Sequence, residues 1–133
     1  MKRLLAFGLV LAFLWALAVT LPAMANPDFD CANVSEIPKI ECKALVTLYN
    51  STDGLNWYDH DNWLVTNTPS DWYGVGVDTG HVITLELSSN QLSGTIPATL
   101  SDLGSLQGLE LMSNQLSGAI PPELGNLSNL VQL

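Results

Sequence analysis

The residue types that most often carry chemistry are few in this chain of 133 residues, which has two cysteines and two histidines. Cys31 and Cys42 show no C-x-x-C spacing, and His60 and His81 lie far from them in sequence, so no zinc signature is present. Neither histidine has a serine or cysteine partner in a recognisable catalytic motif. Residues 59–62 (Asp-His-Asp-Asn) lack the glycine and the terminal glutamate of a calcium loop, which favours a solvated loop. We therefore expect no enzyme activity, no metal and no cofactor.

The N-terminus has the pattern of an export signal. Lys2 and Arg3 precede an uncharged, largely apolar run over 4–21, and the small residues of an A-x-A site follow at 23–25. This order predicts a secretory signal peptide, residues 1–25, that is cleaved after Ala25. The alternative is an uncleaved membrane anchor, because the run has the length of a short membrane span.

The two cysteines both follow the expected cleavage site. Because exported proteins fold in an oxidising compartment, we expect a disulfide between Cys31 and Cys42. Closing a loop of about 12 residues stabilises a chain by roughly 3 kcal/mol in the chain-entropy model. The alternative is a pair of free, buried thiols.

The charge balance excludes one class of partner. Four Lys and Arg residues stand against 13 Asp and Glu residues, which gives a formal net charge of -9. Removal of Lys2 and Arg3 with the signal peptide makes the balance still more acidic. Because nucleic-acid binding relies on clustered cations that neutralise phosphates, we expect no nucleic-acid partner. The length allows one small domain at most.

The second half of the chain contains an internal repeat of 24 residues. Residues 82–105 and 106–129 share the pattern L-x-x-L-x-L-x-x-N-x-L-S-G-x-I-P-x-x-L-x-x-L-x-x, and a third copy begins at 130. Such periodicity is typical of stacked units, since one copy cannot bury its leucines alone. Because the third copy has only begun at Leu133, we expect the chain to be the N-terminal part of a longer protein.

Each fixed position of the repeat has a physical reason. Alternation of Leu85 and Leu87 with polar residues predicts a short strand that is buried on one face. Asn90 and Asn114 follow the strands, where an inward amide can bond to loop backbone, so we expect a stacked asparagine ladder. The leucines spaced by three residues after Pro97 predict a short helical or 3₁₀ return segment.

These motifs resemble a known family, the leucine-rich repeats of the plant-specific type. The resemblance rests on L-S-G-x-I-P at 92–97 and 116–121, and on A-L-V-T-L-Y at 44–49 with its tryptophan-containing continuation to Val75, which is similar to that family's N-terminal cap. It implies an α/β solenoid: a right-handed leucine-rich-repeat superhelix with a helical plus β-hairpin N-terminal cap, truncated after about two repeats. The implied division is a cap over 26–81 and repeats over 82–133. Such caps often carry cysteines where this chain has Ser70 and Val77.

The residues of the cap region agree with this reading. The apolar residues Ile37, Ile40, Ala44, Leu45 and Leu48 fall at the spacing of one buried helix face, which predicts a helix over 38–49. Residues 72–77 and 81–87, separated by Asp-Thr-Gly, predict a β-hairpin that covers the first edge of the repeat sheet. The aromatic residues concentrated here either fill the core or form a platform that stacks on sugars; they are Tyr49, Trp57, Tyr58, Trp63, Trp72 and Tyr73.

The candidate ligand-binding surface is the outward face of the repeat strands. Glu86 and Glu110 lie one repeat apart, so we expect them on neighbouring strands about 5 Å from each other. The surface is either a solvated acidic face or one edge of a concave site for a basic or hydroxyl-rich partner. Its candidate residues are Thr84, Glu86, Ser88, Ser89, Glu110, Met112 and Ser113, and the structural residues are Asn90, Asn114, Cys31 and Cys42.

The resemblance implies recognition rather than catalysis. We expect a secreted or cell-surface module that binds an extracellular protein, peptide or glycan through the concave strand face. A membrane is a partner only if the signal segment stays uncleaved or a downstream anchor exists. Two alternatives remain open: the ectodomain of a membrane receptor kinase, and a structural spacer of a cell-surface protein.

Overall fold

The structure of the protein is a computed structural model that describes residues 28–133, so the expected signal peptide lies outside the described residues. In chain order its elements are η1 (Cys31–Asn33), α1 (Lys39–Ser51), η2 (Gly54–Asn56), η3 (Pro69–Asp71), β1 (Val75–Asp78), β2 (His81–Glu86), β3 (Ser93–Thr95), η4 (Ala98–Asp102), β4 (Gly108–Glu110), β5 (Gln115–Ser117) and η5 (Pro122–Asn126), where η denotes a 3₁₀ helix.

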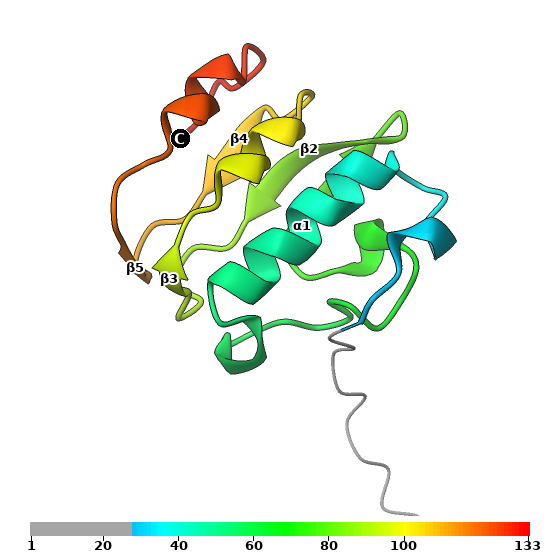
Figure 1. The fold of residues 1–133 in the computed structure, drawn as a ribbon, viewed down its shortest axis with the longest axis horizontal. Helices are drawn as coiled ribbons and strands as arrows, with labels where there is room; N and C mark the ends of the chain where they lie inside the picture. Colours follow the sequence, from blue (N-terminus) through cyan, green and yellow to red (C-terminus); the bar gives the residue numbers. More distant parts are fainter. Residues whose placement is uncertain (1–27) are drawn as a thin grey trace, which may run out of the picture.

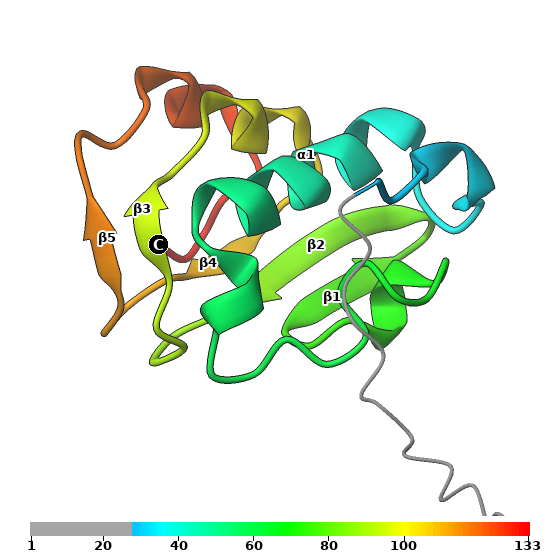
Figure 2. The same cartoon turned by 60° about the horizontal axis from the view of Figure 1, so that its bottom comes forward.

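The elements form two layers with a small second sheet at one side (Figure 1). Strands β1, β2 and β4 form one sheet, in which β1 and β2 are antiparallel and β2 and β4 are parallel. The other layer is a row of α1, η4 and η5, in which α1 packs against η4 and η4 against η5 (Figure 2). Helix α1 therefore takes the place that the return segment of a preceding repeat would take.

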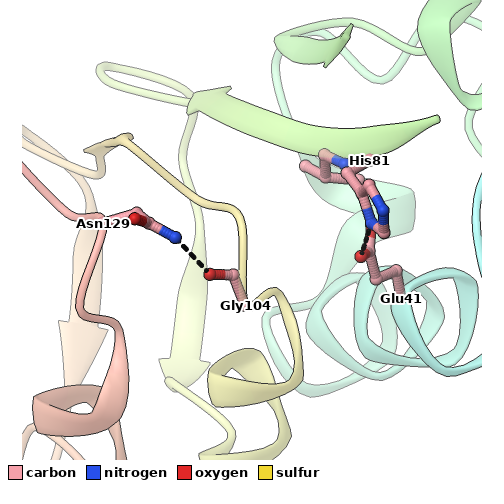
Figure 3. Close-up of polar contacts among 5 residues, drawn as sticks. Glu41, His81, Gly104 and Asn129 are labelled. Carbon is pink, nitrogen blue, oxygen red and sulfur yellow. Dashed lines mark hydrogen bonds and ion pairs between the residues drawn. The ribbon is translucent and has the colours of Figure 1, made fainter. Parts of the chain in front are cut away.

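The helix α1 agrees with the predicted helix over 38–49. One assignment within it was wrong: Ile40 is 55% exposed, and the buried side contains Glu41 instead. The carboxylate of Glu41 accepts a hydrogen bond from the Val82 backbone N–H at 2.9 Å and contacts Nδ1 of His81 at 2.7 Å (Figure 3). Because a buried carboxylate needs such partners, this pair of contacts fixes the start of β2 against the helix.

The core is built mainly from the leucines that the repeat pattern predicts. The leucines of the strand and return segments are almost fully buried in the first repeat and at the start of the second: Leu85, Leu87, Leu92, Leu100, Leu103 and Leu106. The predicted 3₁₀ return segments are present as η4 and η5. The hydrogen bond between the Gln107 N–H and the Ile83 carbonyl recurs 24 residues later, between the Val131 N–H and the Gln107 carbonyl.

The aromatic residues of the N-terminal half mostly fill the core. Trp57, Trp63 and Trp72 are at most 4% exposed, and Tyr49 stacks on Trp63 at a ring distance of 5.7 Å. Burial, and secondarily the nearby Asp53 carboxylate, raises the pKa of Tyr49 above its ordinary value. The core interpretation is confirmed for these four rings. Tyr58 and Tyr73 are exposed.

The asparagine ladder is present and reaches beyond the repeats. The Oδ1 atom of Asn114 accepts hydrogen bonds from the backbone N–H groups of Asn90 (2.9 Å) and Leu92 (3.0 Å), and its Nδ2 donates to the Leu87 carbonyl (2.8 Å). Asn90 bonds in the same way to both backbone groups of Asp59, at 2.7 and 2.8 Å. The loop around Asp59 thus occupies the position of a preceding repeat's turn.

The second sheet was not predicted. Strands β3 and β5 pair in parallel, with Gly94 opposite Leu116. Gly94 has a φ of 81°, and a Cβ atom there would collide with the Ser51 carbonyl at the end of α1. A glycine is therefore required where the first copy of the L-S-G motif passes the helix.

A disulfide and a long-range hydrogen bond connect the segments that surround α1. The predicted disulfide between Cys31 and Cys42 is confirmed and joins η1 to α1. At position 70, where the resemblance implied a cysteine, the backbone N–H of Ser70 donates to the Glu36 carboxylate at 2.8 Å. This contact links the start of η3 to the segment before α1 without a second disulfide.

The ladder makes a testable prediction about two asparagines. Asn114→Ala removes the partner of buried backbone groups and should destabilise the protein by about 1–3 kcal/mol more than Asn126→Ala. Asn126 is the matched control because it is exposed in η5. Urea unfolding of both variants checks this, and equal midpoints would show that the Asn114 side chain does not stabilise the turn.

Candidate functional site

The candidate site is the outward face of the sheet formed by β1, β2 and β4. Leu85 and Leu109 point into the core and are at most 1% exposed, so the residues beside them in each strand face away from it. The parallel register places Thr84 beside Gly108 and Glu86 beside Glu110. The structure thus brings three of the predicted site residues, Thr84, Glu86 and Glu110, onto one surface.

A row of small residues crosses this face. Gly76 of β1 pairs with Thr84 of β2, Thr84 pairs with Gly108 of β4, and Gly108 forms a further bridge to Gln132. A Cβ atom on Gly76 would collide with Oγ1 of Thr84, and one on Gly108 would lie 3.4 Å from its Cγ2. Of the three paired positions on β1, β2 and β4, only Thr84 therefore carries a side chain.

The small residues leave a shallow depression on the sheet. It has a volume of about 180 Å³ and is lined by Gly74, Val75, Gly76, Thr84 and Glu86. Its floor is largely strand backbone, because the glycines carry no side chain. Such a floor admits an extended chain or a flat group close to the sheet.

The electrostatics of the face are set by the two glutamates. Glu86 is exposed, while Glu110 is partly buried and accepts a hydrogen bond at 2.7 Å from the Gln132 side-chain amide. Neighbouring strands are about 4.8 Å apart, so the two carboxylates are adjacent like charges. The two lysines among the described residues, Lys39 and Lys43, are both on α1 in the other layer. The face therefore presents an uncompensated negative charge.

The other predicted site residues lie beyond the strand ends. Strand β2 ends at Glu86 and β4 at Glu110, so Ser88, Ser89, Met112 and Ser113 belong to the turns that follow. Ser89 and Ser113 have a positive φ of 55° and are exposed, and Met112 is 69% exposed. Ser88 differs, because its hydroxyl oxygen is buried without a hydrogen-bond partner.

Sequence reasoning missed three residues of this face: Gly74, Gly76 and Gln132. The hairpin was predicted, but its register was not, and the register decides which side of β1 faces outward. The isolated glycines of the W-Y-G-V-G-V segment were the available signal, since a glycine inside a strand often marks a close approach.

Residues 28–133 contain neither a metal-binding cluster nor a membrane-spanning helix. Within this range no group of three or more His, Cys, Asp or Glu side chains is arranged to hold a metal ion. The same range contains no helix with the length and apolar character needed to cross a bilayer.

Comparison with known proteins identifies the fold. Residues 81–103 and 105–127 each match the family model of the Leucine Rich Repeat. The structure also matches the LRR ectodomain of the receptor kinase SOBIR1 from Arabidopsis thaliana, with a TM-score of 0.56 and 26% identity over 72% of this chain. The chain is a plant-type leucine-rich-repeat protein.

Two other solved structures support this leucine-rich-repeat assignment. The PEPR1-AtPEP1 structure matches with a TM-score of 0.57 and 27% identity over 68% of this chain. The ectodomain of the Arabidopsis receptor kinase HAESA, in complex with an extended IDA peptide hormone, matches with a TM-score of 0.54 and 28% identity over 69%. The chain spans 13%, 52% and 16% of the PEPR1, SOBIR1 and HAESA chains respectively. None of the curated proteins matches it by sequence.

The contact between Gly76 and Thr84 makes a testable prediction. Gly76→Ala should destabilise the protein by about 1–3 kcal/mol, because the new methyl group meets the Thr84 hydroxyl. In a Thr84→Ala background the same change should cost much less, since the colliding atom is gone. Unfolding of the two single variants and the double variant checks this, and additive effects would show that the two side chains do not share that space.

Proposed function

We propose that this protein is an extracellular recognition module whose outward sheet face binds an extended peptide segment that carries a basic residue. The observation that carries the proposal is that Glu86 lines the depression above Gly76 and Thr84 and lies beside Glu110 of the next strand. The glycine-lined floor allows a peptide backbone to approach, and the two carboxylates attract a cation.

The geometry favours a peptide over the other partners that the sequence left open. Strand Gly108–Glu110 is short, and the depression is shallow, so a compact globular ligand would find little area here. The rings that would stack on a sugar are mostly buried in the core. The similar HAESA ectodomain has been solved in complex with an IDA peptide hormone, which supports a peptide partner for this chain.

The proposal includes the organisation of the chain. Residues 1–25 act as a signal peptide, 26–81 form an N-terminal cap, and repeats occupy 82–105 and 106–129, with a third starting at 130. The cap contains α1 and β1, and β1 pairs with β2 of the first repeat, so that the cap closes one edge of a right-handed superhelix. The protein acts outside the cell by recognition and performs no catalysis.

A second candidate function is the ligand-binding ectodomain of a membrane receptor kinase. The observation that favours it is the likeness to the ectodomains of SOBIR1 and HAESA, both described as receptor kinases. The peptide-binding face would be the same, and the difference would be a membrane anchor downstream. The sequence of the complete gene distinguishes the two candidates.

The test begins with a selection. A phage-displayed library of random nine-residue peptides is selected on the purified protein, and amide chemical shifts are recorded with the enriched peptides. We expect enrichment of Lys and Arg, and shift changes at Gly76, Thr84 and Gly108. Glu86→Gln combined with Glu110→Gln should weaken binding about tenfold or more, since charge-assisted contacts are lost.

Glu123→Gln is the matched control, because Glu123 is exposed in η5 in the other layer and its loss should leave affinity unchanged. Enriched peptides without Lys or Arg, or shift changes confined to other surfaces, would contradict the proposal.

A further inference from the structure

A separate depression lies in the helical layer, away from the sheet face. It has a volume of about 310 Å³ and opens between the segment that leads into η1 and the outer side of α1, which are neighbours at the N-terminal end of the described chain (Figure 1). Its lining residues are Phe29, Asp30, Cys31, Lys39, Lys43, Val46 and Thr47.

Both lysines of residues 28–133 line this one depression, and this part of the chain has no arginine. Lys39 and Lys43 are four residues apart on α1, so their side chains lie on the same side of the helix. Neither forms an ion pair with a described carboxylate, although the chain has 13 acidic residues.

The positions of the lysines oppose local helix electrostatics. Like charges four residues apart repel each other. Lys39 is also the first residue of α1, where the partial positive charge of the helix end disfavours a cation. Both lysines of residues 28–133 are thus placed unfavourably, although carboxylates are abundant in this range, which indicates that the two lysines bind an anion from solution.

The rest of the depression is suited to an apolar body. Phe29 and Val46 are half-buried, and Phe29 is fixed by an edge-on contact with Trp72 at a ring distance of 5.4 Å. The disulfide between Cys31 and Cys42 holds the segment that contains Phe29 against α1. Thr47 adds a hydroxyl group that can donate a hydrogen bond. Asp30 is the unfavourable group, but its Oδ1 already accepts a hydrogen bond from the Ala32 N–H at 2.8 Å.

We propose that this depression is a binding site for a small organic anion, with a carboxylate or sulfate group attached to an aromatic ring. The oxyanion lies between the ammonium groups of Lys39 and Lys43, and the ring packs on Phe29 and Val46. The volume matches a single ring with its substituent and is at the lower end for ligand pockets. The site is independent of the proposed peptide face, which lies in the other layer.

Phenyl sulfate and phenylacetate are the probes, with benzyl alcohol and sodium sulfate as the neutral and ring-free comparisons. Each is titrated into the purified, oxidised protein, and the amide shifts of α1 are followed. We expect saturable shifts at Lys43 and Thr47 with the two aromatic anions, and at least about fivefold weaker binding of benzyl alcohol and of sulfate. Equal binding of benzyl alcohol, or binding of sulfate as tight as that of phenyl sulfate, would overturn the proposal.

Variants that remove the two lysines, and one that removes the nearby acidic group, should change the affinity in opposite directions. Lys39→Gln with Lys43→Gln should weaken binding of phenyl sulfate about tenfold, whereas Thr99→Glu with Ala119→Glu, which lowers the net charge equally at exposed sites elsewhere, should leave it nearly unchanged. Asp30→Asn keeps the capping oxygen and removes the repelling charge, so binding should tighten about threefold. Unchanged affinity in the lysine variant, with retained folding shown by its shifts, would overturn the proposal.

Discussion

The structure depends on how the backbone that follows each strand is hydrogen-bonded. The chain leaves the sheet there, and Asn90 and Leu92 of the first turn are buried residues, where an unpaired N–H or carbonyl is costly. The Asn114 side chain both donates hydrogen bonds to and accepts them from the turn of the preceding unit. Asn90 does the same one unit earlier. With the turns joined in this way, the leucines on either side are brought into one continuous core.

This constraint explains how the N-terminal segment and the repeats form a single body. Asn90 belongs to the first repeat, yet its side chain bonds to Asp59 in a loop that has no repeat sequence. Helix α1 likewise stands in line with η4 and η5, and the end of α1 requires Gly94 in the L-S-G motif. In the N-terminal segment, the loop at Asp59 therefore takes the position of a repeat's turn, and α1 takes the position of a repeat's return segment.

The distribution of charge separates two surfaces. The sheet face has Glu86 and Glu110 with no lysine in its layer, and the two lysines of the described chain share one side of α1. A cation is attracted to the first surface and an anion to the second. Because the two surfaces are in different layers, ligands on them need not compete.

The repeat periodicity predicted the leucine core, the strands, the 3₁₀ return segments and the asparagine ladder, because each depends on local spacing. Partner choice across long sequence distances was not predictable. Buried Glu41 contacts His81 and Val82, about forty residues away in sequence. Helical spacing alone does not reveal these contacts, so the sequence predicted that Ile40, and not Glu41, is buried. Gly74 and Gly76 at the site were missed for the same reason, since their position on the outward face depends on the register between β1 and β2. The pairing of β3 with β5 also depends on the stacking of two units.

Amide hydrogen exchange tests the central claim most directly, namely that the asparagine side chains join the N-terminal loop and the repeats into one cooperative unit. The N–H groups of Asp59, Asn90 and Leu92 have a side-chain carbonyl as their acceptor and lie outside the strands. The account predicts that they exchange as slowly as the N–H group of Leu85 in the sheet, because all would exchange only by global unfolding. Exchange of Asp59 and Leu92 at the rate of exposed loop residues, with the sheet still protected, would contradict it.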